Sequence, residues 1–139
     1  MRYEQIELIG IFSSFAHDTE FKVILQHGLY IYNKQVANLE KIALKLNVPL
    51  PNRPTQPVSS PIDPETITDR FMFRTILSWE LSSLDTHVTA IIETIKNDAL
   101  RKLWSEVLNA ELEYYDKYLK YGKMKGWTRV VPIYGEPVT

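Results

Sequence analysis

Cysteine is absent from this chain of 139 residues, so disulfide bonds, a thiolate nucleophile and a cysteine-based zinc site are all excluded. Glycine is scarce, with five residues, and none belongs to a glycine-rich phosphate loop or a Gly-x-Ser-x-Gly nucleophile elbow. The 16 basic and 17 acidic residues leave a formal net charge of −1, so no basic field attracts nucleic acid or anionic lipid. These absences argue against hydrolase, nucleotide-binding and nucleic-acid-binding functions.

Long apolar runs are missing too, and none approaches the roughly 18 residues expected of a transmembrane helix. The first residues, Met-Arg-Tyr-Glu-Gln-Ile-Glu, are charged and polar, unlike the apolar core of a signal peptide. We therefore expect no membrane span, and a location in the cytoplasm or inside a developing cell. With 45 % hydrophobic and 24 % charged residues, the composition fits a single globular domain over 1–139.

Six of the eight prolines lie in one segment, 48–64, with helix-patterned sequence on both sides. Proline has a fixed φ and no donor N–H, so this segment cannot be helical, but at polyproline rise its 17 residues can reach about 50 Å. A helix of 30 residues is about 45 Å long. The segment can therefore cross the whole length of a helical bundle and deliver the next helix parallel to the last, as in ferritin-like four-helix bundles. The sequence predicts an all-α fold of two antiparallel helical hairpins joined by this Pro-rich crossover.

Strand signals are absent, and helix-type periodicity predicts four helices. We expect them over about 3–16, 19–47, 65–95 and 98–122, followed by an extended C-terminal tail over 123–139. Asp18 and Asn97 are placed to cap the second and fourth helices. Trp127 and Ile133 in the tail are expected to pack against an end of the bundle.

At 100° per residue, each of the three longer helices has a stripe that we expect to face the core. The stripe of the second helix comprises Phe21, Ile24, Gly28, Ile31, Gln35, Leu39, Ile42 and Leu46. That of the third comprises Ile67, Phe71, Leu77, Leu81, Leu84, Val88, Ile91 and Ile95. That of the fourth comprises Leu100, Leu103, Val107, Glu111, Tyr114 and Tyr118. Gly28 is expected to make room for an aromatic ring from the first helix, Phe12 or Phe15.

Gln35 and Glu111 are out of character in these apolar stripes, and a buried carboxylate must be neutralised, hydrogen-bonded or bound to a cation. Glu80, at the edge of its stripe, comes at a similar height in the bundle, so the sequence predicts one buried polar layer of Gln35, Glu80 and Glu111. The Glu111 carboxylate either accepts a hydrogen bond from a tyrosine or from Gln35, or is a metal ligand. His27 lies at the margin of this layer.

Carboxylates and imidazole in a four-helix bundle can hold iron or manganese, but dinuclear sites use Glu-x-x-His on two helices. No glutamate in this chain has a histidine three residues on. We therefore expect no cofactor, and we keep a degenerate iron or manganese site of Glu111, Glu80 and His27 as the alternative. His27 and His87 otherwise fit partly exposed helix positions, with His87 able to pair with Glu106.

The run from Phe12 to Pro51 contains His17-Asp-Thr-Glu-Phe-Lys, a long helix ending Leu39-Glu-Lys-Ile, and Val48-Pro-Leu-Pro. The far end reads Glu111-Leu-Glu-Tyr-Tyr-Asp-Lys-Tyr, then Tyr121-Gly-Lys-Met-Lys-Gly-Trp. Over most of its length the chain resembles the uncharacterised ferritin-like proteins related to spore coat protein F. The resemblance implies a ferritin-like bundle, occurrence in endospore-forming bacteria, a place in the forespore or spore coat, and a structural role with no established reaction.

The first predicted helix is about half as long as the second and third, so it leaves part of their apolar surface uncovered. We expect a second copy to cover that surface in a homodimer, with Trp79, Met72 and Phe73 as candidate contacts.

The sequence thus favours a non-catalytic structural or assembly protein. The alternatives are the metal-binding bundle and a module that binds a small ligand or a protein between its helices, for which an open cavity beside Gly28 would be the sign.

Overall fold

The computed structural model describes residues 2–52 and 66–128, and the secondary structure within these ranges is helical throughout. Its four α-helices are α1 (Arg2–Phe15), α2 (Thr19–Lys45), α3 (Asp69–Glu93) and α4 (Asp98–Lys125). The predicted all-α class is therefore confirmed. None of the described helices is both long enough and apolar enough to cross a membrane.

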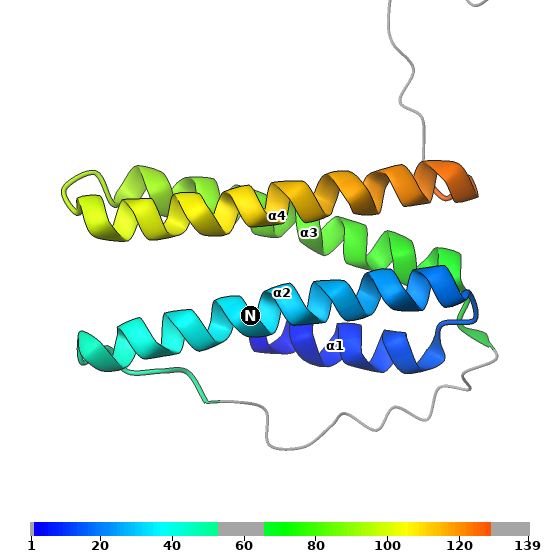
Figure 1. Ribbon diagram of the computed structural model, residues 1–139, viewed down its shortest axis with the longest axis horizontal. Helices are drawn as coiled ribbons and strands as arrows, with labels where there is room; N and C mark the ends of the chain where they lie inside the picture. Colours follow the sequence, from blue (N-terminus) through cyan, green and yellow to red (C-terminus); the bar gives the residue numbers. More distant parts are fainter. Residues whose placement is uncertain (1, 53–65, 129–139) are drawn as a thin grey trace, which may run out of the picture.

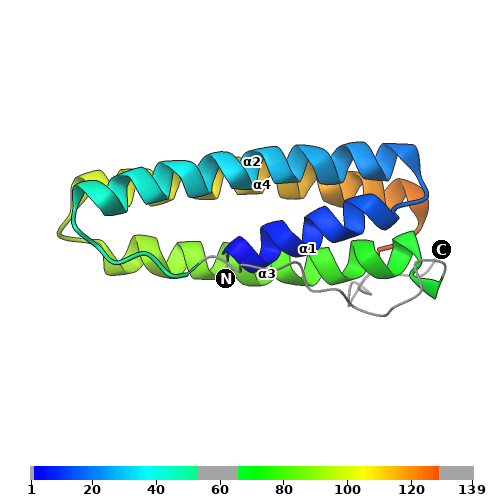
Figure 2. The same cartoon turned by 90° about the horizontal axis from the view of Figure 1, so that it is seen from below.

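The helices form two antiparallel hairpins, α1 with α2 and α3 with α4, which lie against one another along their lengths (Figure 1). Between the hairpins, α2 packs against α4 and α1 packs against α3 (Figure 2). Since α1 has 14 residues and α2 has 27, α1 covers only the part of the bundle nearest the α1–α2 turn.

Helices α2 and α3 begin at the same end of the molecule and run in the same direction (Figure 1). The end of α2 and the start of α3 therefore lie at opposite ends of the bundle. The predicted crossover over 48–64 falls mostly outside the described residues, as does Ile133.

The helix ends follow local capping chemistry. The Asp18 side chain accepts hydrogen bonds from the backbone N–H of Glu20 and Phe21, and the Asn97 side chain accepts one from Leu100, so both predicted caps are confirmed. Helix α3 begins at Asp69, later than predicted, with Thr68 as its cap.

Helix α4 runs through Gly122, where the sequence predicted its end, and stops before Gly126, whose left-handed φ of 73° suits glycine.

Two glycines inside helices make room for aromatic rings. A Cβ at Gly122 would overlap the ring of Phe73, and a Cβ at Gly28 would lie 2.5 Å from Tyr114 Oη. An aromatic ring does cover Gly28, as predicted, but it is the Tyr114 ring of α4 and not Phe12 or Phe15 of α1. The space beside Gly28, where an open cavity was considered, is filled by Tyr114.

Aromatic side chains fill the core near the α1–α2 turn. The rings of Phe73 and Tyr118 stack with centroids 4.4 Å apart, and the Tyr118 hydroxyl donates to the Phe73 carbonyl at 2.8 Å. Trp127 contacts Phe21, Phe73 and Tyr121 edge-on or tilted, so its predicted packing against a bundle end is confirmed.

The predicted core face of α3 was wrong. The buried residues of this helix are Met72, Phe73, Ile76, Glu80, Ser83 and His87. Leu81, Val88 and Ile95, from the predicted stripe, are exposed instead. Met72 and Phe73 are fully buried in the chain's own core, so they cannot be the contacts of a second copy. The error has a physical cause: the buried face carries three polar residues, while the neighbouring face is the more apolar one.

The predicted core faces of α2 and α4 agree better with the structure than that of α3. On α4 the buried residues are Leu103, Val107, Glu111, Tyr114, Tyr118, Tyr121 and Gly122, close to the predicted set. On α2, Phe21, Gly28 and Gln35 are buried as predicted, but Leu25, Tyr32 and Val36 are buried as well and Leu46 is exposed.

One end of the bundle is fastened by hydrogen bonds between the hairpins. The Asp69 carboxylate, at the start of α3, accepts the backbone N–H of His17 at 2.9 Å and that of Asp18 at 2.7 Å. Lys125, at the end of α4, pairs with the Asp18 carboxylate at 2.6 Å. The α1–α2 turn is thereby attached to both helices of the other hairpin.

Candidate functional site

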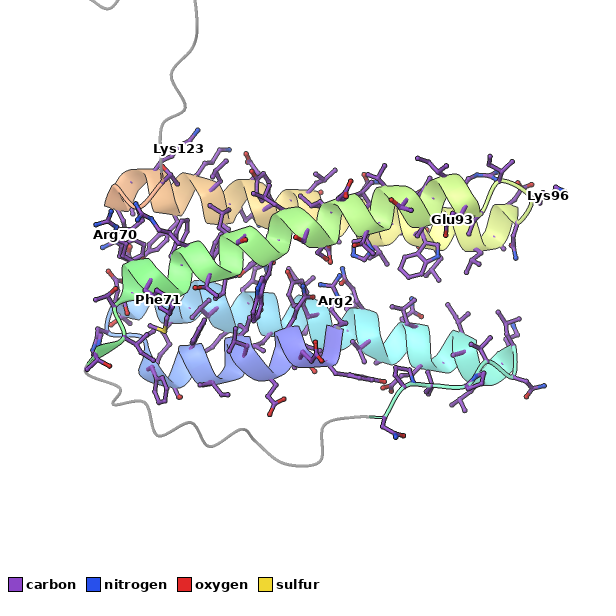
Figure 3. The ribbon with its side chains drawn as sticks, turned by 180° about the vertical axis from the view of Figure 1, so that it is seen from behind. Arg2, Arg70, Phe71, Glu93, Lys96 and Lys123 are labelled. Atoms are coloured by element: carbon purple, nitrogen blue, oxygen red, sulfur yellow. The ribbon has the colours of Figure 1, made fainter. Side chains whose placement is uncertain are left out.

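A cluster of polar side chains lies inside the bundle at the level where α1 begins. Glu80 and Glu111 come from α3 and α4, are only 1 % and 0 % exposed, and are accompanied by Ser83 and His87 of α3. Arg2, the first described residue, reaches this level from α1 (Figure 3). We call Arg2, Glu80, Ser83, His87 and Glu111 the polar cluster.

Glu111 is the centre of the polar cluster. One carboxylate oxygen forms an ion pair with the Arg2 guanidinium, and the other lies 3.0 Å from His87 Nε2 and accepts a hydrogen bond from the Ser83 hydroxyl at 3.3 Å. The charge of this fully buried carboxylate is therefore compensated within the chain, as a buried ion requires.

Arg2 is held by more than its ion pair. Its guanidinium carbon lies 4.3 Å from the centroid of the Tyr32 ring, in cation–π geometry, and its Nη2 lies 2.6 Å from His87 Nε2. Arg2 thus joins all three longer helices at the polar cluster, through Tyr32 of α2, His87 of α3 and Glu111 of α4.

Glu80 has a different environment from Glu111. Its Oε2 has no hydrogen-bond partner among the described residues. Burial, and secondarily the nearby charge of Glu111, raise the pKa of Glu80 to about 8, although Arg2 acts in the opposite direction. A pKa of about 8 favours the neutral form of Glu80 at pH 7, whereas the Glu111 carboxylate is paired with the Arg2 guanidinium. Burial also raises the pKa of the neighbouring Tyr114 and Tyr118 hydroxyls well above the ordinary value, with Glu80 contributing.

The remaining predicted site residues lie apart from the polar cluster. Gln35 is buried on α2, but its amide has no hydrogen-bond partner among the described residues, so it is not the partner of Glu111. His27 is exposed, with its ring centroid 6.0 Å from that of Tyr114. The structure thus brings Glu80 and Glu111 together and leaves His27 outside.

Three members of the polar cluster, Arg2, Ser83 and His87, were not among the site residues predicted from the sequence. Arg2 belongs to a charged N-terminus that looks solvent-exposed, and His87 was assigned to the helix flank with Glu106 as partner, which was wrong. The spacing held a signal, because Ser83 and His87 follow Glu80 by three and seven residues and so share its helix face.

The polar cluster can hold a compensated charge and a neutral acid in an apolar interior. Within 2–52 and 66–128, no three His, Asp or Glu side chains are grouped so that they could hold a metal ion. The cation beside Glu111 is the Arg2 guanidinium.

Residues 3–137 match a family described as "Protein of unknown function (DUF3231)". The fold is similar to the crystal structure of a Bacillus halodurans C-125 protein described as a "putative spore coat protein", with a TM-score of 0.85 and 21 % sequence identity, over 97 % of this chain and 87 % of the other. At this identity the likeness shows the fold. No curated protein matches the chain. The match over nearly the whole sequence shows that this four-helix protein belongs to the DUF3231 family.

Proposed function

We propose that this protein is a non-catalytic structural protein of the spore coat, with a ferritin-like bundle that assembles as a homodimer. The observation that carries the proposal is an apolar stripe on the outer face of α3. Leu81, Val88 and Ile92 are spaced by seven and four residues, which places them on one face of α3, and Ile95 follows in the turn directly after the helix. All four are exposed, Leu81 by 50 % and Ile92 by 60 %. We call these four residues the α3 stripe.

An exposed row of large aliphatic side chains is typical of a protein–protein contact surface. In a two-fold dimer the same stripe from each copy would meet, and because both helices are long and regular they can pack side by side. Trp79, the remaining predicted contact, lies about 160° around the helix from Leu81 at 100° per residue. The proposed contact is therefore the α3 stripe, and not the surface beside α1.

Two further observations support the assignment. The parallel course of α2 and α3 fits the ferritin-like topology with one long crossover (Figure 1). The Bacillus halodurans protein of similar fold carries a coat-related description. A structural role also fits a polar cluster whose central acid is already paired with an arginine and a histidine.

Size-exclusion chromatography with light scattering tests the assembly. We expect a dimer at micromolar concentration, and Val88→Glu should shift it to monomer, because a charge in the α3 stripe cannot be buried without a partner. Val23→Glu on α2, which changes an equally aliphatic exposed residue outside the stripe, is the matched control and should remain dimeric. A monomeric wild-type protein, or a Val88→Glu dimer as stable as the control, contradicts the proposal.

The coat assignment has a separate test. In an endospore-forming bacterium, a fluorescent fusion of this chain should concentrate at the surface of the spore during sporulation. A fusion that stays evenly distributed in the cytoplasm contradicts the coat assignment and leaves the dimer result intact.

A metal-binding bundle is the second candidate, favoured by one observation: two buried acids and the His87 imidazole share one level of the bundle. Binding iron or manganese there requires Arg2 to move away from Glu111, since the Arg2 guanidinium already compensates the Glu111 carboxylate. Metal analysis of protein purified without chelator decides the matter. Stoichiometric iron or manganese that is lost in Glu111→Ala would overturn the structural proposal.

A further inference from the structure

A groove with a volume of about 680 Å³ lies between α2 and α4. Its apolar lining comprises Tyr30, Ile31 and Ala37 of α2 and Leu103, Val107 and Ala110 of α4. Its polar lining comprises Lys34, Gln35, Asn38 and Lys41 of α2 and Glu106 of α4. We call it the α2–α4 groove. None of these residues belongs to α3, so the groove is separate from the α3 stripe.

The floor of the α2–α4 groove is apolar and open because of the side chains that α4 contributes there. Leu103 and Val107 are buried, and Ala110 has only a methyl group with which to fill the space. The volume is that of a small-molecule site. From Tyr30 to Lys41 the wall formed by α2 is about 16 Å long at 1.5 Å per residue. A long and narrow apolar floor suits a linear aliphatic chain.

Two lysines line the same helix wall of this groove. Lys34 and Lys41 are both exposed and are seven residues apart on α2, which places them on one face of the helix, about two turns from each other. Neither takes part in an ion pair with another described residue. Asn38 lies between them, about one turn from each, and its amide can donate hydrogen bonds. An anionic group beside Asn38 is therefore within reach of both ammonium groups.

The opposite wall contributes one acid, Glu106 of α4, which also forms no ion pair with a described residue. With two lysines and one glutamate, the lining of the groove carries one net positive charge. A single anionic group balances that charge, whereas a cation adds to it. An uncharged group leaves both lysines without a partner.

We propose that the α2–α4 groove binds an anionic amphiphile, a molecule with one linear aliphatic chain and one anionic head group such as a carboxylate. The aliphatic chain lies on Leu103, Val107 and Ala110, and the head group lies beside Asn38, between the two lysines. The proposal goes beyond the assembly through the α3 stripe and does not depend on it.

NMR titration of the isotope-labelled protein at pH 7, with three probes that share a ten-carbon chain, tests the proposal. Decanoate is an anion, 1-decanol is uncharged and decyltrimethylammonium is a cation, and each is kept below the concentration at which it aggregates. We expect saturable one-to-one binding of decanoate, with shifts of the backbone amides of Ile31 and Ala110. 1-Decanol should bind about fivefold more weakly, as expected for the loss of two exposed ion pairs, and the cation more weakly still. Octanoate, with two methylene groups fewer, should bind about fivefold more weakly than decanoate.

Charge variants assign the head group to the lysines. The double variant Lys34→Met, Lys41→Met keeps the apolar stems of both side chains, and should bind decanoate and 1-decanol equally tightly. Glu106→Gln should bind decanoate about twofold more tightly than the wild type, because it removes the one negative charge of the lining. Lys123→Met, at an exposed lysine of α4 outside the groove, is the matched control and should bind all probes as the wild type does.

A bulky side chain assigns the aliphatic chain to the floor. Ala110→Trp should weaken the binding of decanoate and 1-decanol alike, by about tenfold or more, provided that circular dichroism shows the variant folded. If it does not fold, Ala37→Trp blocks the groove from an exposed position on α2. Thr86→Trp, on the exposed surface of α3, is the control for the added indole.

The site is refuted if decanoate shows no saturable binding, or if the folded blocking variant binds it as tightly as Thr86→Trp does. The ligand class is refuted if the wild type binds 1-decanol or decyltrimethylammonium as tightly as decanoate, or if the double lysine variant keeps the preference for decanoate. A protein that is monomeric in solution but binds decanoate as expected contradicts the dimer and leaves this proposal intact.

Discussion

Replacing Glu80 by glutamine should change how the stability of the fold depends on pH. The pKa of this buried acid rises from its ordinary 4.5 to about 8 in the folded protein, through burial and the nearby charge of Glu111. In the unfolded chain the acid is hydrated and ionises near its ordinary pKa. Between these two values the unfolded state has released the proton while the folded state still holds it.

The sign of the effect follows from proton linkage. Below the unfolded pKa, Glu80 is protonated in both states and its contribution to stability is fully present. As the pH rises, the unfolded state gains by ionising, so the free energy of unfolding falls by up to about 1.4 kcal/mol per pH unit. Over the interval of about 3.5 pH units between 4.5 and 8, the loss reaches at most about 5 kcal/mol. Glutamine has nearly the same shape and does not ionise, so the variant lacks this loss.

Urea unfolding followed by circular dichroism at about pH 5, 6, 7 and 8 measures the effect. The stability of Glu80→Gln relative to wild type should increase by about 1 kcal/mol per pH unit. The other groups near Glu80, namely Arg2, Glu111, Tyr114 and Tyr118, are present in both proteins and cancel in this comparison. Glu113→Gln, at an exposed glutamate of α4, is the control and should follow the wild type. If the Glu80→Gln and wild-type curves run parallel from pH 5 to pH 8, Glu80 is not a buried neutral acid and the argument fails.

Two other substitutions test the packing and the polar cluster. Gly28→Ala should destabilise the protein by about 1–3 kcal/mol, because the new Cβ meets the Tyr114 ring, whereas Gly10→Ala on α1, with open space around its Cβ, should stabilise it by about 0.5–1 kcal/mol. Arg2→Met should cost about 3 kcal/mol in urea unfolding at pH 7, because it leaves the Glu111 carboxylate buried without its cation.

Each of these two predictions has an outcome that would contradict it. If Gly28→Ala and Gly10→Ala change the unfolding free energy equally, the ring of Tyr114 does not occupy the space beside Gly28. For Arg2, the control is Arg70→Met on the exposed surface of α3, which should change stability by less than about 0.5 kcal/mol. A loss for Arg2→Met as small as that of the control means that Arg2 does not compensate Glu111.

The helices and their caps could be predicted from the sequence because their signals are local. Asp18 and Asn97 cap helices through bonds to residues two or three positions away, and the six clustered prolines separate the two hairpins. The core face of α3 could not be predicted in the same way. Apolar periodicity identifies the most apolar face, and on α3 that face is the exposed α3 stripe.

The polar cluster was predictable only in part, for a related reason. Glu111 stood out because the rest of its stripe on α4 is apolar. Its partners could not be assigned, because Arg2 is 109 residues away in sequence and an arginine near a chain start carries no pattern that distinguishes it. The arrangement of the two hairpins decides which cation reaches Glu111, and that arrangement is a property of the whole fold.

The attachment of the α1–α2 turn to Asp69 has a consequence for internal motion. The hydrophobic core cluster also lies toward that end, reaching from Phe21 and Phe73 to about Tyr32 and Ile76. Native-state hydrogen exchange should therefore be graded along the long helices. Backbone amides of the buried residues Phe73 and Ile76, beyond the first turn of α3, should exchange only when the whole chain unfolds, while those approaching the α3–α4 turn should exchange through brief separations of the two hairpins.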